Sequence, residues 1–359
     1  MKTYESLLER IRSRPRSWLV TGCAGFIGGH IAEQLLKLDQ RVTGLDNFST
    51  GKWENLAHIK ESVGEQRWKN FRFIEGDIRN LETCRDACRS VELVSHQAAL
   101  GSVPRSIDDP AATNDSNVNG QLNMLIAARD AGVARFVYAS SSAVFGDDAN
   151  QPKVEAVIGK PMSPYGLSKY VNELYAEIFA RCYGLSTIGL RYFNVFGPRQ
   201  DPNGAYAAVI PMWVAGMIRN EPIFINGDGE TARDFCYIEN VIQANVLAAT
   251  VDDPAAVNQT YNVAVSGKTS LHELFEIIRS LLEPRYPHLR DLRPRYREFR
   301  PGDVRLSQAN ISKARRLLGY QPVWRVREGL AQAIDWYVAA LAPRPPIKHG
   351  VARPRPAFS

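Results

Sequence analysis

Two side chains with acid–base potential, Tyr165 and Lys169, lie four residues apart in the stretch SPYGLSKYVNEL at residues 163–174. A proline precedes them where a helix would begin, and in a helix residues four apart share one face. An ammonium beside a phenol favours the phenolate, and a tyrosine needs such help because its ordinary pKa is about 10. The pair alone could equally belong to an ordinary amphipathic helix, so its role depends on what surrounds it.

Three consecutive hydroxyl groups, those of Ser140, Ser141 and Ser142, end the β-rich run RFVYASSS. In an open α/β sheet, ligands bind outside the carboxyl ends of the strands, so these hydroxyls and Tyr165 are predicted to face one crevice. Serines at a strand end are more often turn residues. Their position ahead of the Tyr165–Lys169 pair favours a role in the same chemistry.

Glycines recur in VTGCAGFIGGH, where Gly22, Gly25 and Gly28 follow a predicted strand and open a predicted helix. Glycine permits the sharp turn and lets backbone N–H groups approach a pyrophosphate at the helix N-terminus. Asp46 ends the next predicted strand, 18 residues after Gly28. A carboxylate there binds ribose hydroxyls and repels a 2′-phosphate, so the pattern predicts a dinucleotide site for NAD rather than NADP.

The elements that must position these groups follow from the alternation of short β-rich runs with helical patterns. The runs are WLVTG, RVTGLDN, FRFIEGD, LVSHQAA, RFVYASSS and STIGLRYFN, with segments between them long enough for crossover helices. Such alternation predicts an α/β fold, a Rossmann-type doubly wound parallel sheet with a smaller C-terminal lobe. The third run leads into Asp77 and Ile78, where an adenine would rest.

The motifs together resemble those of the extended short-chain dehydrogenase/reductase family. The glycine motif, HQAA, the serine run, YGLSK and RYFNVFGPRQ stand in that family's order and spacing, and the resemblance covers about residues 18–325. Within the family the chain is most similar to the nucleotide-sugar 4-epimerases, above all those acting on UDP-N-acetylglucosamine. The resemblance implies NAD-dependent 4-epimerisation of a UDP-N-acetylhexosamine through a 4-keto intermediate, for surface polysaccharide synthesis. It also implies a homodimer formed through helices near residues 116–132 and 165–182.

The resemblance assigns roles to individual residues as well. Tyr165 would be the base on the sugar 4-hydroxyl, and Lys169 would hold the nicotinamide ribose and lower the pKa of Tyr165. Ser142, with Ser141 beside it, would bridge O4 and the tyrosine. The implied cofactor-binding residues are Gly22, Gly25, Phe26, Ile27, Gly28, Asp46, Asn47, Asp77, Ile78, Gln97, Ala98, Tyr165 and Lys169. The implied substrate-binding residues are Ser142, Asn194, Arg233, Arg300, Asp303 and Ser307.

Ser307 bears on which sugar is bound. In the galactose-type relatives a tyrosine stands seven residues after the equivalent of Arg300 and crowds the C2 substituent, whereas this chain has Ser307 there. A small residue would leave room for an N-acetyl group. Spacing alone fits a solvent-facing serine near a helix N-cap equally well.

Other functions stay open beside this one. Family members that dehydrate or decarboxylate carry an acid after the serine or threonine, whereas Ala143 stands here, so elimination would lack its acid–base pair. A UDP-N-acetylhexosaminuronate or UDP-glucose 4-epimerase would use the same residues. A non-catalytic NAD-sensing scaffold would be expected to lack the tyrosine or the lysine, and both are present.

Composition sets the remaining expectations. Residues 1–17 form a basic N-terminal extension, 18–192 the NAD-binding domain (completed by segments near 234–264), 193–342 mainly the nucleotide-sugar lobe, and 343–359 a Pro/Arg-rich tail predicted to be disordered. The net charge of +6 belongs to the two ends, which argues against a nucleic-acid-binding face. The five cysteines are scattered and the histidines do not cluster, which predicts a reducing compartment and no metal site. The sequence shows neither a secretory signal nor an apolar run long enough to span a membrane, so we expect a cytoplasmic protein without membrane partners.

Overall fold

A seven-stranded parallel sheet forms the centre of the molecule. The computed structural model describes residues 4–202, 208–299 and 304–341. The strand order is β11-β6-β5-β4-β1-β2-β3, and every neighbouring pair is parallel. The order reverses between β1 and β4, which makes the switch point where such sheets bind ligands. This arrangement confirms the predicted Rossmann-type fold. The strands are β1 (Ser17–Thr21), β2 (Arg41–Asp46), β3 (Phe71–Glu75), β4 (Leu93–His96), β5 (Arg135–Ser141), β6 (Thr187–Tyr192) and β11 (Gln259–Val263).

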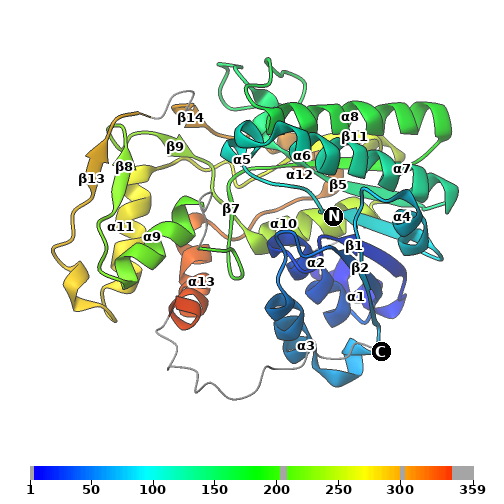
Figure 1. Cartoon of the computed structure of the whole chain (residues 1–359), viewed down its shortest axis with the longest axis horizontal. Helices are drawn as coiled ribbons and strands as arrows, with labels where there is room; N and C mark the ends of the chain where they lie inside the picture. The colour runs from blue at the N-terminus through cyan, green and yellow to red at the C-terminus, as the bar shows by residue number, and fades with distance from the viewer. Residues whose placement is uncertain (1–3, 203–207, 300–303, 342–359) are drawn as a thin grey trace.

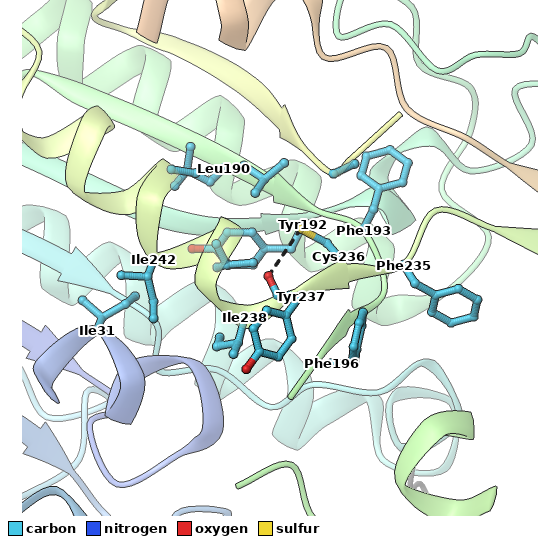
Figure 2. Packing of buried hydrophobic residues seen from close by; sticks show 14 of the residues in the cluster. Ile31, Leu190, Tyr192, Phe193, Phe196, Phe235, Cys236, Tyr237, Ile238 and Ile242 are labelled. Atoms are coloured by element: carbon cyan, nitrogen blue, oxygen red, sulfur yellow. Dashed lines mark hydrogen bonds between the residues drawn. The ribbon is translucent and has the colours of Figure 1, made fainter. Parts of the chain in front are cut away.

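Helices cover both faces of the sheet (Figure 1). Figure 2 shows the core on one face, where Ile31 of α2 and Ile238 and Ile242 of α10 lie near Leu190 of β6. Because both faces are covered, β1, β4 and β6 are almost wholly buried along their length, which is typical of parallel strands. The helices on that face are α2 (Phe26–Lys37), α3 (Trp53–Trp68) and α10 (Ile238–Thr250), and those on the other are α4 (Leu81–Cys88), α5 (Val103–Asp108), α6 (Pro110–Asn114), the π-helical turn η1 (Asp115–Asn119), α7 (Gly120–Asp130) and α8 (Pro164–Tyr183).

A smaller second lobe lies beside the carboxyl edge of the sheet, at the left of Figure 1. Its longer helices in the described part of the chain are α9 (Val209–Ile218), α11 (Leu271–Leu282) and α13 (Val326–Leu341), and α11 begins with a capping box formed by Ser270 and Glu273. Short strands form small sheets separate from the central one. They are β7 (Val195–Phe196) paired with β10 (Cys236–Tyr237), β8 (Phe224–Asn226) with β13 (Arg295–Arg297), and β12 (Thr269–Ser270) and β14 (Leu306–Ser307) on either side of β9 (Ala232–Arg233); α12 (Ser312–Leu318) follows β14.

The basic N-terminal extension contains a helix, α1 (Tyr4–Ser13), that packs on the domain. Ile11 is buried, and the side chain of buried Gln40 donates to its carbonyl oxygen at 2.9 Å. Arg10 pairs with Asp252 after α10 at 3.1 Å. The predicted disordered tail lies outside the described residues. Within the part of the chain that the structure describes, no helix has the length and apolarity needed to cross a membrane.

Candidate active site

A cleft of about 1100 Å³ runs along the carboxyl edge of the sheet and reaches the second lobe. It gathers predicted residues that lie far apart in the chain. Asp77 is not among its lining residues, and Arg300 and Asp303 lie outside the described residues. The predicted residues that line it are Gly22, Gly25, Phe26, Ile27, Gly28, Asp46, Asn47, Ile78, Gln97, Ala98, Ser141, Ser142, Tyr165, Lys169, Asn194, Arg233 and Ser307.

The glycine turn opens the N-terminus of α2 toward the cleft. Gly22 has φ +67°, and a Cβ there would lie 2.9 Å from the backbone nitrogen of Ala98. A Cβ on Gly28 would lie 2.2 Å from the carbonyl oxygen of Gly22, so only glycine lets helix and turn approach this closely. Gly25 caps α2 without any side-chain hydrogen bond to the helix. The first N–H groups of α2 are therefore not capped by a side chain, as an anion-binding helix end requires.

Asp46, at the end of β2, lines the cleft and also holds the glycine turn in place. Its carboxylate accepts hydrogen bonds from the backbone N–H groups of Ala24 at 2.9 Å and Phe48 at 2.8 Å. Burial raises its pKa above the ordinary 3.8, while these two bonds oppose the rise. Asp77 instead pairs with Arg79 at 2.7 Å, a contact that lowers its pKa to about 2. Asp77 thus contacts Arg79 rather than the cleft, and it holds Asn47 through a 2.8 Å hydrogen bond.

Tyr165 and Lys169 lie on the first turns of α8. Ser163 caps this helix by accepting from Gly166 N–H at 3.0 Å, and Pro164 stands in its first turn. Lys169 is buried, donates to the carbonyl oxygen of Ala139 at 2.9 Å, and lies 6.0 Å from the centre of the Tyr165 ring. Burial lowers the pKa of Lys169 to about 8.

The same burial raises the pKa of Tyr165 above 10, and a hydrogen bond with Ser141 opposes the rise. In this structure desolvation therefore outweighs the hydrogen bond from Ser141. That Lys169 lowers the pKa of Tyr165 when cofactor and substrate are bound stays a prediction.

The three serines at the end of β5 have different partners. Ser140 also lines the cleft, and its hydroxyl donates to Glu173 at 2.5 Å. Ser141 hydrogen-bonds Tyr165 and accepts from Ala143 N–H at 3.1 Å, which starts the short 3-10 helix η2 (Ser142–Phe145). Ser142 lines the cleft. Ser141 is thus the serine that hydrogen-bonds the tyrosine here. That Ser142, with Ser141 beside it, bridges O4 and the tyrosine stays a prediction.

A buried ion pair supports this end of the cleft. Glu173, on α8, binds Arg191 of β6 through both carboxylate oxygens, at 2.9 and 2.8 Å, and also accepts from Ser140. The two charged side chains are 7% and 4% exposed. Because the pair joins α8 to β5 and β6, it fixes the helix that carries Tyr165 against the strand that carries Ser141. No sequence motif pointed to this pair.

On the second lobe, Asn194, Arg233 and Ser307 bring polar groups into the cleft. Asn194 adopts φ +33° and donates to the carbonyl oxygen of Asp234 at 3.2 Å. Arg233 ends β9 and Ser307 ends β14, two strands paired in parallel. Other lining residues escaped the sequence reasoning because only the folded loops bring them here: Gly101, Ser102, Val103, Pro104, Met162, Gln200 and Val304.

These features fit NAD. The open helix end suits the pyrophosphate, Asp46 lies where the adenosine ribose is bound in such sheets, and Lys169 and Tyr165 lie farther along the same cleft. The family sequence profile described as "NAD dependent epimerase/dehydratase family" matches residues 18–264.

The chain belongs to this family.

Its family is NAD-dependent, which confirms the expected cofactor. Among similar proteins, a putative UDP-glucose 4-epimerase of Methanocaldococcus jannaschii is 37% identical over 89% of this chain and 97% of its own length. A UDP-glucuronate 4-epimerase of Thermodesulfobacterium geofontis is 32% identical over 89% of this chain and 95% of its own. A solved UDP-N-acetylglucosamine 4-epimerase from Methanobrevibacter ruminantium, in complex with UDP-N-acetylmuramic acid, is 36% identical with a TM-score of 0.82, over 91% and 99% of the two chains. These likenesses support an epimerase acting on a UDP-sugar, and they do not separate the sugars.

Proposed function

We propose that this protein is a UDP-N-acetylglucosamine 4-epimerase that interconverts UDP-GlcNAc and UDP-GalNAc for surface polysaccharide synthesis. One observation carries the proposal: Tyr165, hydrogen-bonded by Ser141, shares a single cleft with Ser307, the small residue expected beside the sugar C2 group. Similarity to UDP-glucose and UDP-glucuronate epimerases makes those sugars the alternatives to test.

The chain's own residues would act on O4 of the sugar. Tyr165 takes the O4 proton, with Ser141 orienting its hydroxyl, and later returns a proton to O4 after the bound 4-keto sugar has turned over. NAD, when bound, supplies the acceptor and then the donor of the C4 hydride. Lys169 keeps a positive charge near the tyrosine below about pH 8. The reaction is redox-neutral overall.

The second lobe would hold the nucleotide while the sugar turns. A guanidinium such as that of Arg233 donates two parallel hydrogen bonds to a diphosphate, and Asn194 adds an amide beside it. Ser307 leaves room for an N-acetyl group at C2, where a phenol ring would overpack the site at a cost of typically about 1–3 kcal/mol.

The proposal is tested with four substrates. Purified protein is incubated with UDP-GlcNAc, UDP-glucose and the two corresponding uronates, and the products are followed by NMR. We expect UDP-GalNAc to form fastest. Preferred turnover of UDP-glucose or of a uronate would overturn the choice of sugar, and absence of any 4-epimer would overturn the activity itself.

Substitution of Ser307 sharpens this test. Ser307→Tyr should lower kcat/KM for UDP-GlcNAc by at least about tenfold, since each 1.4 kcal/mol is tenfold in rate, and leave UDP-glucose turnover largely intact. Ser307→Ala, which keeps the site small, is the matched control and should retain both activities. Equal loss of both activities in Ser307→Tyr, or no loss, would show that this residue does not gate the acetyl group.

We also propose that the protein acts as a homodimer. Leu167, Leu174 and Ile178 of α8 are 52%, 44% and 38% exposed, and their spacings of seven and four residues place them on one face. Leu122 and Ile126 of neighbouring α7 are partly buried. An apolar helical face of this kind is typical of a protein–protein interface.

The five cysteines are unpaired, which supports the proposed reducing, cytoplasmic setting.

A further inference from the structure

Asp234 follows Arg233 directly and contacts the other two substrate-facing residues of the second lobe through its backbone. Its N–H donates to the carbonyl oxygen of Ser307 at 2.9 Å. Its own carbonyl oxygen accepts from the side chain of Asn194 at 3.2 Å. Asp234 itself is 0% exposed and does not line the cleft. One buried residue thus joins Asn194, Arg233 and Ser307, which come from three separate parts of the chain.

The carboxylate of Asp234 joins its own strand to two other segments, the loop after β11 and the residues after β14. One oxygen accepts from Val265 N–H at 3.0 Å, just after β11, and the other accepts from Ala309 N–H at 3.2 Å, just after β14. The backbone N–H of Gly267 contributes a further hydrogen bond. A buried carboxylate is stable only when such donors replace its water, so this group depends on both segments being in place.

We propose that Asp234 is a positioning residue, which holds Asn194, Arg233 and Ser307 in the arrangement that binds the UDP part of the substrate. The inference rests on the proposed function, because it takes the cleft to bind a UDP-sugar. Binding groups held in advance lose less conformational entropy when the ligand arrives, so their fixation should appear in affinity.

Gln151 provides the comparison, because its side chain fixes only one of the three segments. Its amide donates to Leu306 O at 2.6 Å and accepts from Gln308 N–H at 3.1 Å, so it pairs with β14 on both sides of Ser307. No hydrogen bond of the Gln151 side chain reaches Asn194 or Arg233 within the described residues. A change at Gln151 therefore loosens β14 alone. A change to the Asp234 carboxylate loosens the residue that follows Arg233 and whose backbone binds both Asn194 and Ser307.

The experiment compares Asp234→Asn, which keeps the size and removes the charge, with Gln151→Ala. Dissociation constants for UDP are measured by calorimetry at pH 8 on NAD-loaded protein, together with NAD content, kcat and KM. Asp234→Asn should raise the UDP dissociation constant and KM at least about tenfold, and NAD content and kcat should stay within about threefold. Gln151→Ala should raise the UDP dissociation constant by less than about threefold.

Three results would overturn the inference: unchanged UDP affinity in Asp234→Asn, loss of NAD and kcat together with UDP affinity, or an equal effect of Gln151→Ala. If wild-type protein does not bind UDP, the proposed function fails instead, which separates the two outcomes.

A measurement on wild-type protein covers the case in which Asp234→Asn does not fold. Burial raises the pKa of Asp234 to about 6, and the nearby charge of Arg325 opposes this rise. The adjacent Arg233 carries a second positive charge, and burial raises the pKa values of Cys236 and Tyr320. KM for the best of the four substrates should therefore rise as the pH falls below about 6. A KM that stays constant from pH 8 to pH 5 would overturn the inference.

Discussion

Gly28→Ala should weaken NAD binding strongly and change the stability of the fold only slightly. A Cβ at this position would lie 2.2 Å from the carbonyl oxygen and 2.7 Å from the carbonyl carbon of Gly22. A relaxed contact between carbon and oxygen is about 3.3 Å or longer. The glycine turn would therefore have to move by about 1 Å. The added atom meets backbone, so no side-chain rotation relieves the overlap.

The expected loss of NAD affinity follows from the hydrogen bonds that this turn would donate to the pyrophosphate. A hydrogen bond to a charged group contributes about 1.5–3 kcal/mol, so misplacing one pyrophosphate donor should weaken NAD binding about 10- to 100-fold. Alanine has the better helix propensity by about 1 kcal/mol, which offsets part of the strain in α2. We therefore expect a large fall in NAD affinity with a small change in melting temperature.

Gly29→Ala is the matched control, one residue along the same helix. Its Cβ would lie 3.2 Å from the carbonyl oxygen of Cys23 and 3.5 Å from a methyl carbon of Ile59, so shifts of a few tenths of an ångström suffice. Protein stripped of cofactor is titrated with NAD by calorimetry, and melting is followed in parallel. The reasoning is refuted if Gly28→Ala binds NAD within threefold of wild type, or if Gly29→Ala loses as much affinity.

Tyr165→Phe should lower kcat by about 100-fold or more while NAD stays bound, because the base is lost and the ring remains; undiminished turnover, measured by NMR, would rule out this tyrosine as the base. Because burial lowers the pKa of Lys169 to about 8, its charge is present below that pH and lost above it. We expect kcat to decline above about pH 8 and this decline to shift to higher pH in Lys169→Arg; a pH–rate profile that is the same in both proteins would contradict this. Leu174→Glu should convert dimer to monomer in light scattering, whereas Val323→Glu, at an apolar position 69% exposed outside α8, should not; a Leu174→Glu protein that stays dimeric would place the interface elsewhere.

Local patterns in the sequence were enough to predict the sheet, the NAD site and the Tyr165–Lys169 pair, whereas the second-lobe residues of the cleft followed from the family resemblance. The glycine spacing, Asp46 at the end of β2, and the four-residue step from Tyr165 to Lys169 depend on strand and helix geometry that short segments determine themselves. Once the strands are known to be parallel, the residues at their carboxyl ends can be predicted to lie in one cleft, since these ends meet at one edge of the sheet. This is why residues as distant as Gly22 and Lys169 line the same cleft.

Only the tertiary structure decided which groups contact one another. Three adjacent serines look alike in sequence, yet the strand end turns Ser140 toward Glu173 and Ser141 toward Tyr165. The acidic residue after Arg233 carries no recognisable signal, because its partner Ala309 lies 75 residues away and is reached through a backbone N–H that every residue but proline possesses. The pKa of Lys169 likewise depends on the water excluded around it. Spacing fixes which residues share a face, whereas burial and long-range backbone contacts decide what each of them does there.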